Sequence, residues 1–178
     1  MSGTPRGLPS AIERLSATGP FAPEDRDLML FGRLVGAWDV EWAAFDSAGA
    51  TVERRRGEWH FAWVLGGRGV QDVISIAGAP RDSDGTTLRC WDPELGAWRA
   101  VFMSPGDGEY AILVGRPDGD RIVQERLPWG SAASPAPAQR WTFSEITAES
   151  FLWQAQTLRE SGGTCTVTHE IRAIRQGA

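Results

Sequence analysis

Hydrophobic and polar side chains alternate with a period of two along most of this chain. The first clear stretch places Trp38, Val40 and Trp42 on one side, with Asp39 and Glu41 on the other. Because successive side chains of a strand point to opposite faces, this pattern predicts a half-buried β-strand.

Clusters of Gly, Pro, Asp and Ser interrupt the alternation roughly every 8–14 residues. The runs between them are rich in Trp, Val, Ile, Thr and Phe, which are typical of strands. Evenly spaced hairpins without intervening helices favour an all-β fold, an antiparallel up-and-down meander that closes into a barrel or folds as a sandwich. The runs predict ten strands, at residues 37–46, 52–64, 69–77, 86–92, 97–104, 109–116, 121–127, 140–145, 150–158 and 164–175.

The residues before the first strand have a helical pattern instead. Ser10 and Glu13 form a capping box, which predicts a short helix that ends at Gly19-Pro20. A second helix is expected over residues 23–34, with an apolar face of Leu28, Phe31 and Leu34. We therefore expect one domain over residues 1–178, with a helical segment at 1–35 and a β-barrel at 36–178.

The longest predicted connection is Leu127–Gln139, "LPWGSAASPAPAQ", which is rich in Pro, Ala and Ser. A loop near the upper limit of about 12–15 residues is usually either a functional element or a mobile connector. The sequence leaves open whether this segment is a connector or a lid over the barrel mouth.

The composition is that of an ordinary globular domain, with 42% hydrophobic and 23% charged residues among 178. A net charge of −5 argues against nucleic-acid binding, which needs a surplus of basic residues. The chain contains no Lys, so Schiff-base and P-loop lysine chemistry are excluded.

No stretch is long and apolar enough for a signal peptide or a membrane span, so we expect no membrane partner. Cys90 and Cys165 lie far apart without CxxC spacing, which indicates buried thiols in a reducing cytoplasm. Two histidines and two such cysteines make a zinc site improbable, and no metal ligands are assigned.

A Gly-x-Trp motif at the start of the first strand, after an N-terminal helix, resembles the calycin superfamily of lipocalins, fatty-acid-binding proteins and nitrobindins. The motif is Gly36-Ala37-Trp38. The resemblance implies that Trp38 plugs the closed end of a barrel and that an Arg near the chain end, Arg172 or Arg175, packs over it.

Ten predicted strands fit the fatty-acid-binding and nitrobindin branch better than eight-stranded lipocalins. The segments "VGAWDVEW", "GEWHFAWVLGGRGVQDV" and "TTLRCWDPELGAW" also resemble bacterial lipocalin-like proteins of unknown function. These likenesses imply a calycin-like fold, whereas function depends on the site that the fold carries.

Strand parity selects the side chains that face the barrel interior. In "GEWHFAWV", for example, Trp59, Phe61 and Trp63 share one side, and the aromatic side is the expected interior. These side chains either fill the barrel or line a pocket for a flat or apolar ligand. The predicted ligand-binding residues on these strands are Trp42, Trp59, Phe61, Trp63, Arg89, Trp91, Trp98, Phe102, Trp141, Phe143 and Trp153.

The last strand adds His169, a titratable group on an otherwise apolar side that contains Val167 and Ile171. Fatty-acid-binding proteins bind a carboxylate with an Arg and a Tyr two residues apart, whereas the similar places here hold Val167 and His169. His169 is therefore a satisfied core residue, a ligand contact or acid–base group, or an axial haem ligand as in nitrobindins. Nitrobindins have glycines where this chain has Val40 and Trp42, whose bulk would crowd a haem.

Asp72 lies between Val70 and Ile74 and has interior parity. It is expected either to pair with Arg89 or to act as a base. The main hypothesis is a barrel that binds a small apolar or aromatic molecule without a cofactor. One alternative is a cofactor-free isomerase or cyclase with His169 and Asp72 as the catalytic acid and base, and Arg89 stabilising charge. The other is haem binding through His169. A homodimer is left open.

Overall fold

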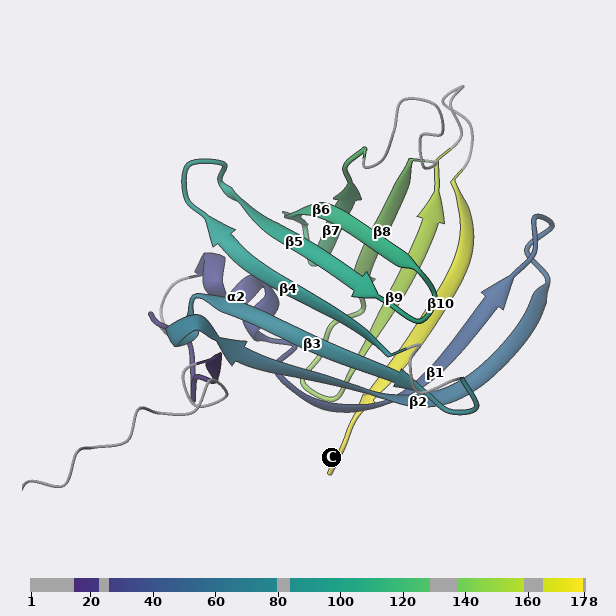
Figure 1. The fold of residues 1–178 in the computed structure, drawn as a ribbon, viewed down its shortest axis with the longest axis horizontal. Helices are drawn as coiled ribbons and strands as arrows, with labels where there is room; N and C mark the ends of the chain where they lie inside the picture. Colours follow the sequence, from purple (N-terminus) through teal and green to yellow (C-terminus); the bar gives the residue numbers. More distant parts are fainter. Residues whose placement is uncertain (1–14, 23–25, 80–83, 129–137, 159–164, 178) are drawn as a thin grey trace, which may run out of the picture.

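The computed structural model describes residues 15–22, 26–79, 84–128, 138–158 and 165–177. Within this part of the chain, ten antiparallel strands close into a barrel, because each strand pairs with its sequence neighbours and β1 also pairs with β10 (Figure 1). The strands are β1 (Gly36–Phe45), β2 (Thr51–Val64), β3 (Gly69–Ile76), β4 (Gly85–Asp92), β5 (Ala97–Ser104), β6 (Glu109–Asp118), β7 (Arg121–Arg126), β8 (Gln139–Ser144), β9 (Ser150–Thr157) and β10 (Thr166–Arg175).

All ten predicted strands are confirmed, with ends that agree within two residues. The closed ladder selects the barrel over the sandwich. A 3₁₀ turn, η1 (Leu65–Gly67), joins β2 to β3. The connection at Leu127–Gln139 falls mostly outside the described residues, so its role as a connector or a lid stays a prediction.

One short helix, α2 (Arg26–Gly32), lies against one end of the barrel (Figure 1). Leu28 and Phe31 form the buried face that was predicted for it. The predicted end at residue 34 is wrong, because the helix ends at Gly32 and the buried Leu34 follows it. Phe31 meets the ring of Trp98 edge to face at 5.1 Å between centroids, and that of Phe143 at 6.1 Å. The helix thus joins the aromatic core at this end. The helix predicted to start at Ser10 begins outside the described residues, and its predicted end at Gly19-Pro20 is wrong, because Ser16 already forms a β-bridge with Val64.

The prediction that the aromatic side of β2 faces the barrel interior is confirmed. Trp59, Phe61 and Trp63 are between 3% and 6% exposed, whereas His60 and Ala62 between them are exposed. The barrel interior is therefore built from the aromatic side of the strands, as the alternation predicted.

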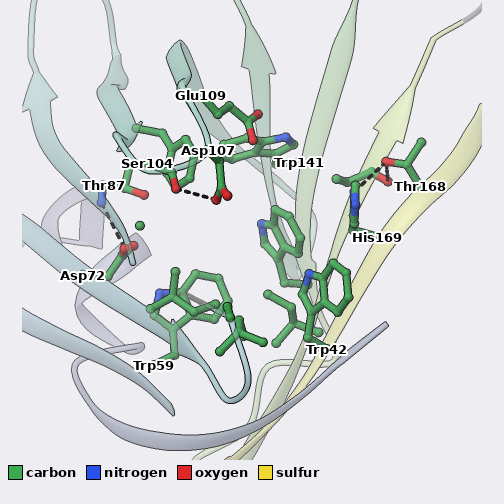
Figure 2. Close-up of a pocket in the computed structure, with 18 of the residues that line it drawn as sticks. Trp42, Trp59, Asp72, Thr87, Ser104, Asp107, Glu109, Trp141, Thr168 and His169 are labelled. Carbon is green, nitrogen blue, oxygen red and sulfur yellow. Dashed lines mark hydrogen bonds between the residues drawn. The ribbon is translucent and has the colours of Figure 1, made fainter. Parts of the chain in front are cut away.

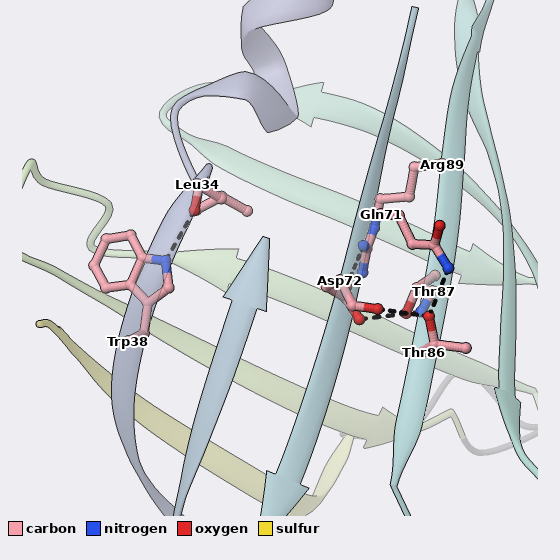
Figure 3. Close-up of polar contacts among 7 residues, drawn as sticks. All are labelled: Leu34, Trp38, Gln71, Asp72, Thr86, Thr87 and Arg89. Atoms are coloured by element: carbon pink, nitrogen blue, oxygen red, sulfur yellow. Dashed lines mark hydrogen bonds and ion pairs between the residues drawn. The ribbon is translucent and has the colours of Figure 1, made fainter. Parts of the chain in front are cut away.

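Trp38 and Arg175 close the barrel at the end near α2. The Trp38 indole is fully buried, and its Nε1 donates a hydrogen bond to the Leu34 carbonyl at 2.8 Å (Figure 3). The guanidinium carbon of Arg175 lies 4.0 Å from the centroid of that indole. Arg172 points to solvent instead and forms an ion pair with Glu170. Of the two arginines left open by the sequence, Arg175 is the one that packs over the tryptophan.

Among the described residues, no helix has the length and apolar character needed to cross a membrane. Both cysteines are free thiols, but Cys165 is exposed and Cys90 only partly buried, so the prediction that they are buried is wrong.

Candidate ligand-binding cavity

A cavity of about 540 Å³ lies inside the barrel, at the end opposite to α2. It extends to the hairpin between β5 and β6, where Ser104, Asp107 and Glu109 border it (Figure 2). The β5 strand orients the two ends: Trp98 at its start contacts Phe31 of α2, and Ser104 at its end borders the cavity. The barrel is therefore filled in one half and hollow in the other.

Indole rings form much of the cavity wall (Figure 2). Trp141 of β8 meets Trp153 of β9 at 5.5 Å between centroids and 69° between planes, and Phe102 of β5 at 5.2 Å and 83°. These edge-to-face contacts leave the rings without a parallel neighbour among these partners. The predicted ligand-binding residues that border the cavity are Trp42, Trp59, Arg89, Phe102, Trp141, Trp153 and His169.

The other predicted ligand-binding residues do not border this cavity. They lie in the filled half, where Trp98 donates from Nε1 to the Asp27 carbonyl at 2.9 Å and Trp91 packs beside Trp98. Parity tells which face of a strand a side chain is on, but it does not tell how deep along the barrel the side chain lies. This group consists of Phe61, Trp63, Trp91, Trp98 and Phe143.

Asp72 and Arg89 form a buried ion pair on adjacent strands, β3 and β4, beside the cavity (Figure 3). Each side chain is only 1% exposed. Arg89 Nη1 donates to Asp72 Oδ2, and the Thr87 backbone N–H donates to Asp72 Oδ1 at 3.0 Å. The ion pair that the sequence left as one option is present, and both carboxylate oxygens of Asp72 are engaged.

The same region contains two buried donors without a hydrogen-bond partner in the described part of the chain, Trp59 Nε1 and Arg89 Nε. The Arg89 guanidinium also lies 5.1 Å from the ring centroid of Phe31. The positive charge of Arg89 is thus held between a carboxylate and aromatic rings, and it is not directed to solvent.

A β-bulge in β10 places two consecutive side chains on the cavity wall. The pairing with β9 shifts between Val167 and His169, so that Thr168 is the extra residue. Both Thr168 and His169 border the cavity. Strict alternation predicts that Thr168, next to the inward-facing His169, lies on the outer face. No residue type in this segment predicts the bulge. Thr168 is therefore a cavity residue that the sequence analysis missed.

His169 is a half-buried imidazole beside Trp42, 5.4 Å away between ring centroids and tilted by 33°. Its Nδ1 lies 3.1 Å from the Thr168 hydroxyl oxygen. Burial lowers the pKa of His169 below its ordinary value of 6.5, because desolvation disfavours the charged imidazolium. At neutral pH the group is therefore an uncharged imidazole that can donate or accept a hydrogen bond.

Polar side chains at the cavity mouth form a second set that the sequence analysis missed. The Ser104 hydroxyl donates to Asp107 Oδ2 at 2.7 Å, within the hairpin that the sequence marked only as a turn. Burial raises the pKa of Glu109, and nearby Asp107 adds to this effect, while Arg126 opposes it. The mouth also includes Glu53, Arg55 and Gln139.

The haem alternative depends on His169 as an axial ligand and on room beside it. Val40 is buried in the interior and Trp42 borders the cavity, so both keep their bulk at the places where nitrobindins have glycines. These residues fit a macrocycle poorly, and haem binding stays a prediction. No cluster of three His, Cys, Asp or Glu side chains suited to a metal ion occurs in the described residues.

No family model and no curated protein matches the chain. Among solved structures, it is similar to the S-type phycobiliprotein lyase CPES from Guillardia theta, with a TM-score of 0.53. The likeness covers 84% of this chain and 92% of that protein, at 10% sequence identity. It shows a shared barrel fold. The finer assignment to the fatty-acid-binding or nitrobindin branch stays a prediction.

Proposed function

We propose that this chain binds a small apolar or aromatic molecule inside the hollow half of its barrel. The observation that carries the proposal is the cavity of about 540 Å³ bordered by four tryptophans. Ligand sites typically have about 300–1,000 Å³ and combine an apolar lining with a few polar groups. The cavity has this composition, because its indoles share the space with the Asp72–Arg89 pair and His169.

Two further observations support binding over a purely structural role. The filled half of the barrel contains a continuous aromatic core that includes α2, whereas the other half keeps an open cavity. The similar solved structure is named a phycobiliprotein lyase, which makes a small-molecule role for this barrel shape reasonable.

The proposal is tested by titrating the protein with Nile red, a neutral apolar dye, while following dye emission and tryptophan fluorescence. Ala155 borders the cavity and is 5% exposed, so Ala155→Phe is expected to fill part of the space and to abolish saturable dye uptake. Ala62→Phe is the matched control, because Ala62 is exposed on the outer face of β2. Uptake that is absent in the unmodified protein, or equal in all three proteins, would contradict the proposal.

A catalytic role is a second candidate, because His169, Asp72 and Arg89 all border one cavity. Figure 2 shows Asp72 and His169 on opposite sides of it, as expected from their places on β3 and β10. In such an enzyme the neutral His169 imidazole would remove a proton from the carbon next to a substrate carbonyl. Arg89 would stabilise the resulting enolate oxygen. The test is solvent deuterium exchange into 2-tetralone followed by NMR. Exchange that His169→Ala does not slow would exclude this role.

A further inference from the structure

The charged side chains around the cavity include two close ion pairs and two further acids, Asp107 and Glu109. Asp72 is neutralised by Arg89 within the wall. At the mouth, Glu53 is neutralised by Arg55, whose Nη2 lies 2.6 Å from Glu53 Oε1. These two pairs contribute no net charge to the cavity.

Asp107 has no ion pair among the described residues, and Glu109 has only a longer one than these two pairs. Asp107 accepts a hydrogen bond from the uncharged Ser104 hydroxyl, and no ion pair to it occurs in the described residues. The nearest cation to Glu109 is Arg126, 3.6 Å away between Nη1 and Oε1. That Arg126 nitrogen also donates to Gln139 Oε1 at 2.8 Å, so the guanidinium is shared. Among the described residues at the cavity mouth, acidic groups therefore outnumber basic ones.

Among the described residues that line the cavity, each arginine is already paired with a carboxylate. The Arg89 guanidinium is committed to Asp72, and Arg55 is committed to Glu53. His169 is uncharged at neutral pH, because burial lowers its pKa. A carboxylate that entered this space would lose its hydration without gaining an ionic partner.

The indole faces favour the opposite sign of charge. A cation near the face of a tryptophan is attracted by the ring quadrupole, and the attraction grows when water is excluded. Figure 2 shows the carboxylate of Asp107 directed into the cavity, across from Trp59, with Glu109 beside Trp141. Acidic groups and indoles thus border the same space.

We propose that the cavity selects a flat aromatic cation, with the rings held among Trp42, Trp141 and Trp153 and the positive charge facing Asp107 and Glu109. This inference rests on the proposed function, because it names the ligand class for the same cavity. If the cavity selects a cation, a long-chain carboxylate is excluded as its ligand.

The test compares three probes of one ring system by equilibrium dialysis at neutral pH and physiological salt. The probes are 9-aminoacridine, which is a cation, acridine, which is neutral, and acridine-9-carboxylate, which carries an anionic group. We expect 9-aminoacridine to bind at least about tenfold more tightly than the carboxylate. The double variant Asp107→Asn, Glu109→Gln keeps the shape of both side chains and is expected to reduce this preference to about threefold or less.

The matched control is Asp118→Asn, Glu125→Gln, which removes the same charge from exposed sites outside the cavity. It is expected to leave the preference unchanged. If the three probes bind equally, or if both double variants have the same effect, the cation inference is wrong while the proposed function stands. If none of the three binds, the proposed function and the inference both fail.

Discussion

Arg175 lies over the indole of Trp38, with its guanidinium carbon 4.0 Å from the ring centroid, and this contact joins the end of the last strand to the start of the first. Arg175 also donates from Nη1 to the Val35 carbonyl at 3.0 Å and from Nε to the Ala148 carbonyl at 2.5 Å. One side chain therefore ties three segments together at the closed end of the barrel.

Removing this side chain is expected to weaken the barrel. Arg175→Ala loses a cation–π contact and several hydrogen bonds, and we expect the free energy of unfolding to fall by about 1–3 kcal/mol. Urea denaturation measures this change. Arg172→Ala is the control, because Arg172 is exposed on the same strand. Equal effects of the two substitutions would contradict the role assigned to Arg175.

Gly36 is required beside that contact for two reasons. Its φ of +140° lies in a region that other residues avoid, and an added Cβ would lie 2.1 Å from Arg175 Nη1. We expect Gly36→Ala to destabilise the protein by about 1–3 kcal/mol. Gly19→Ala is the control, since Gly19 has open space around it and no positive φ.

A double-mutant cycle separates the two reasons. If the clash with Arg175 contributes, Gly36→Ala costs less in an Arg175→Ala background than in the unmodified protein. Full additivity of the two substitutions would leave backbone strain as the sole reason.

The Asp72–Arg89 pair is expected to matter for folding in a specific way. Arg89→Met leaves the Asp72 carboxylate buried without its cation, and breaking such a pair typically costs about 3–5 kcal/mol. Adding Asp72→Asn removes the uncompensated charge and should restore part of the stability. Arg121→Met, which breaks an exposed pair with Asp118, should have a much smaller effect in the same denaturation series. A double variant less stable than Arg89→Met alone would contradict this view.

His169 is expected to make the free energy of unfolding depend on pH. Its pKa is lower in the folded protein than the ordinary value of 6.5, so the unfolded chain binds this proton more readily. The contribution to stability is complete above about pH 6.5 and is lost as the pH falls from there through the folded-state pKa. We expect His169→Asn to reduce the loss of stability between neutral and mildly acidic pH. An unchanged slope would show that other groups are responsible.

The sequence predicted the barrel well because the signals for it are local. Turn residues bound each strand, and the alternation around Trp38 and Trp59 identifies the interior face. The same alternation overestimated the number of residues around the cavity. Phe61 and Trp141 both point into the barrel, yet only Trp141 borders the cavity. Phe61 lies in the half that the aromatic core and α2 fill.

The polar part of the site was harder to predict. Thr168 reaches the cavity through a bulge, which depends on pairing between β9 and β10 and not on residue type. Asp107 and Glu109 reach it because the β5–β6 hairpin lies at the barrel mouth. Such positions follow from the closure of the whole sheet, so a single sequence carries no local sign of them.

NMR of the tryptophan indole N–H groups shows whether a small molecule enters the hollow half of the barrel. The signals are assigned by single Trp→Phe substitutions, and the protein is titrated with acridine. We predict saturable shifts for Trp42, Trp141 and Trp153, which border the cavity, and little change for Trp38 and Trp98 in the closed half. Shifts that are absent, or that are confined to Trp38 and Trp98, would contradict the account.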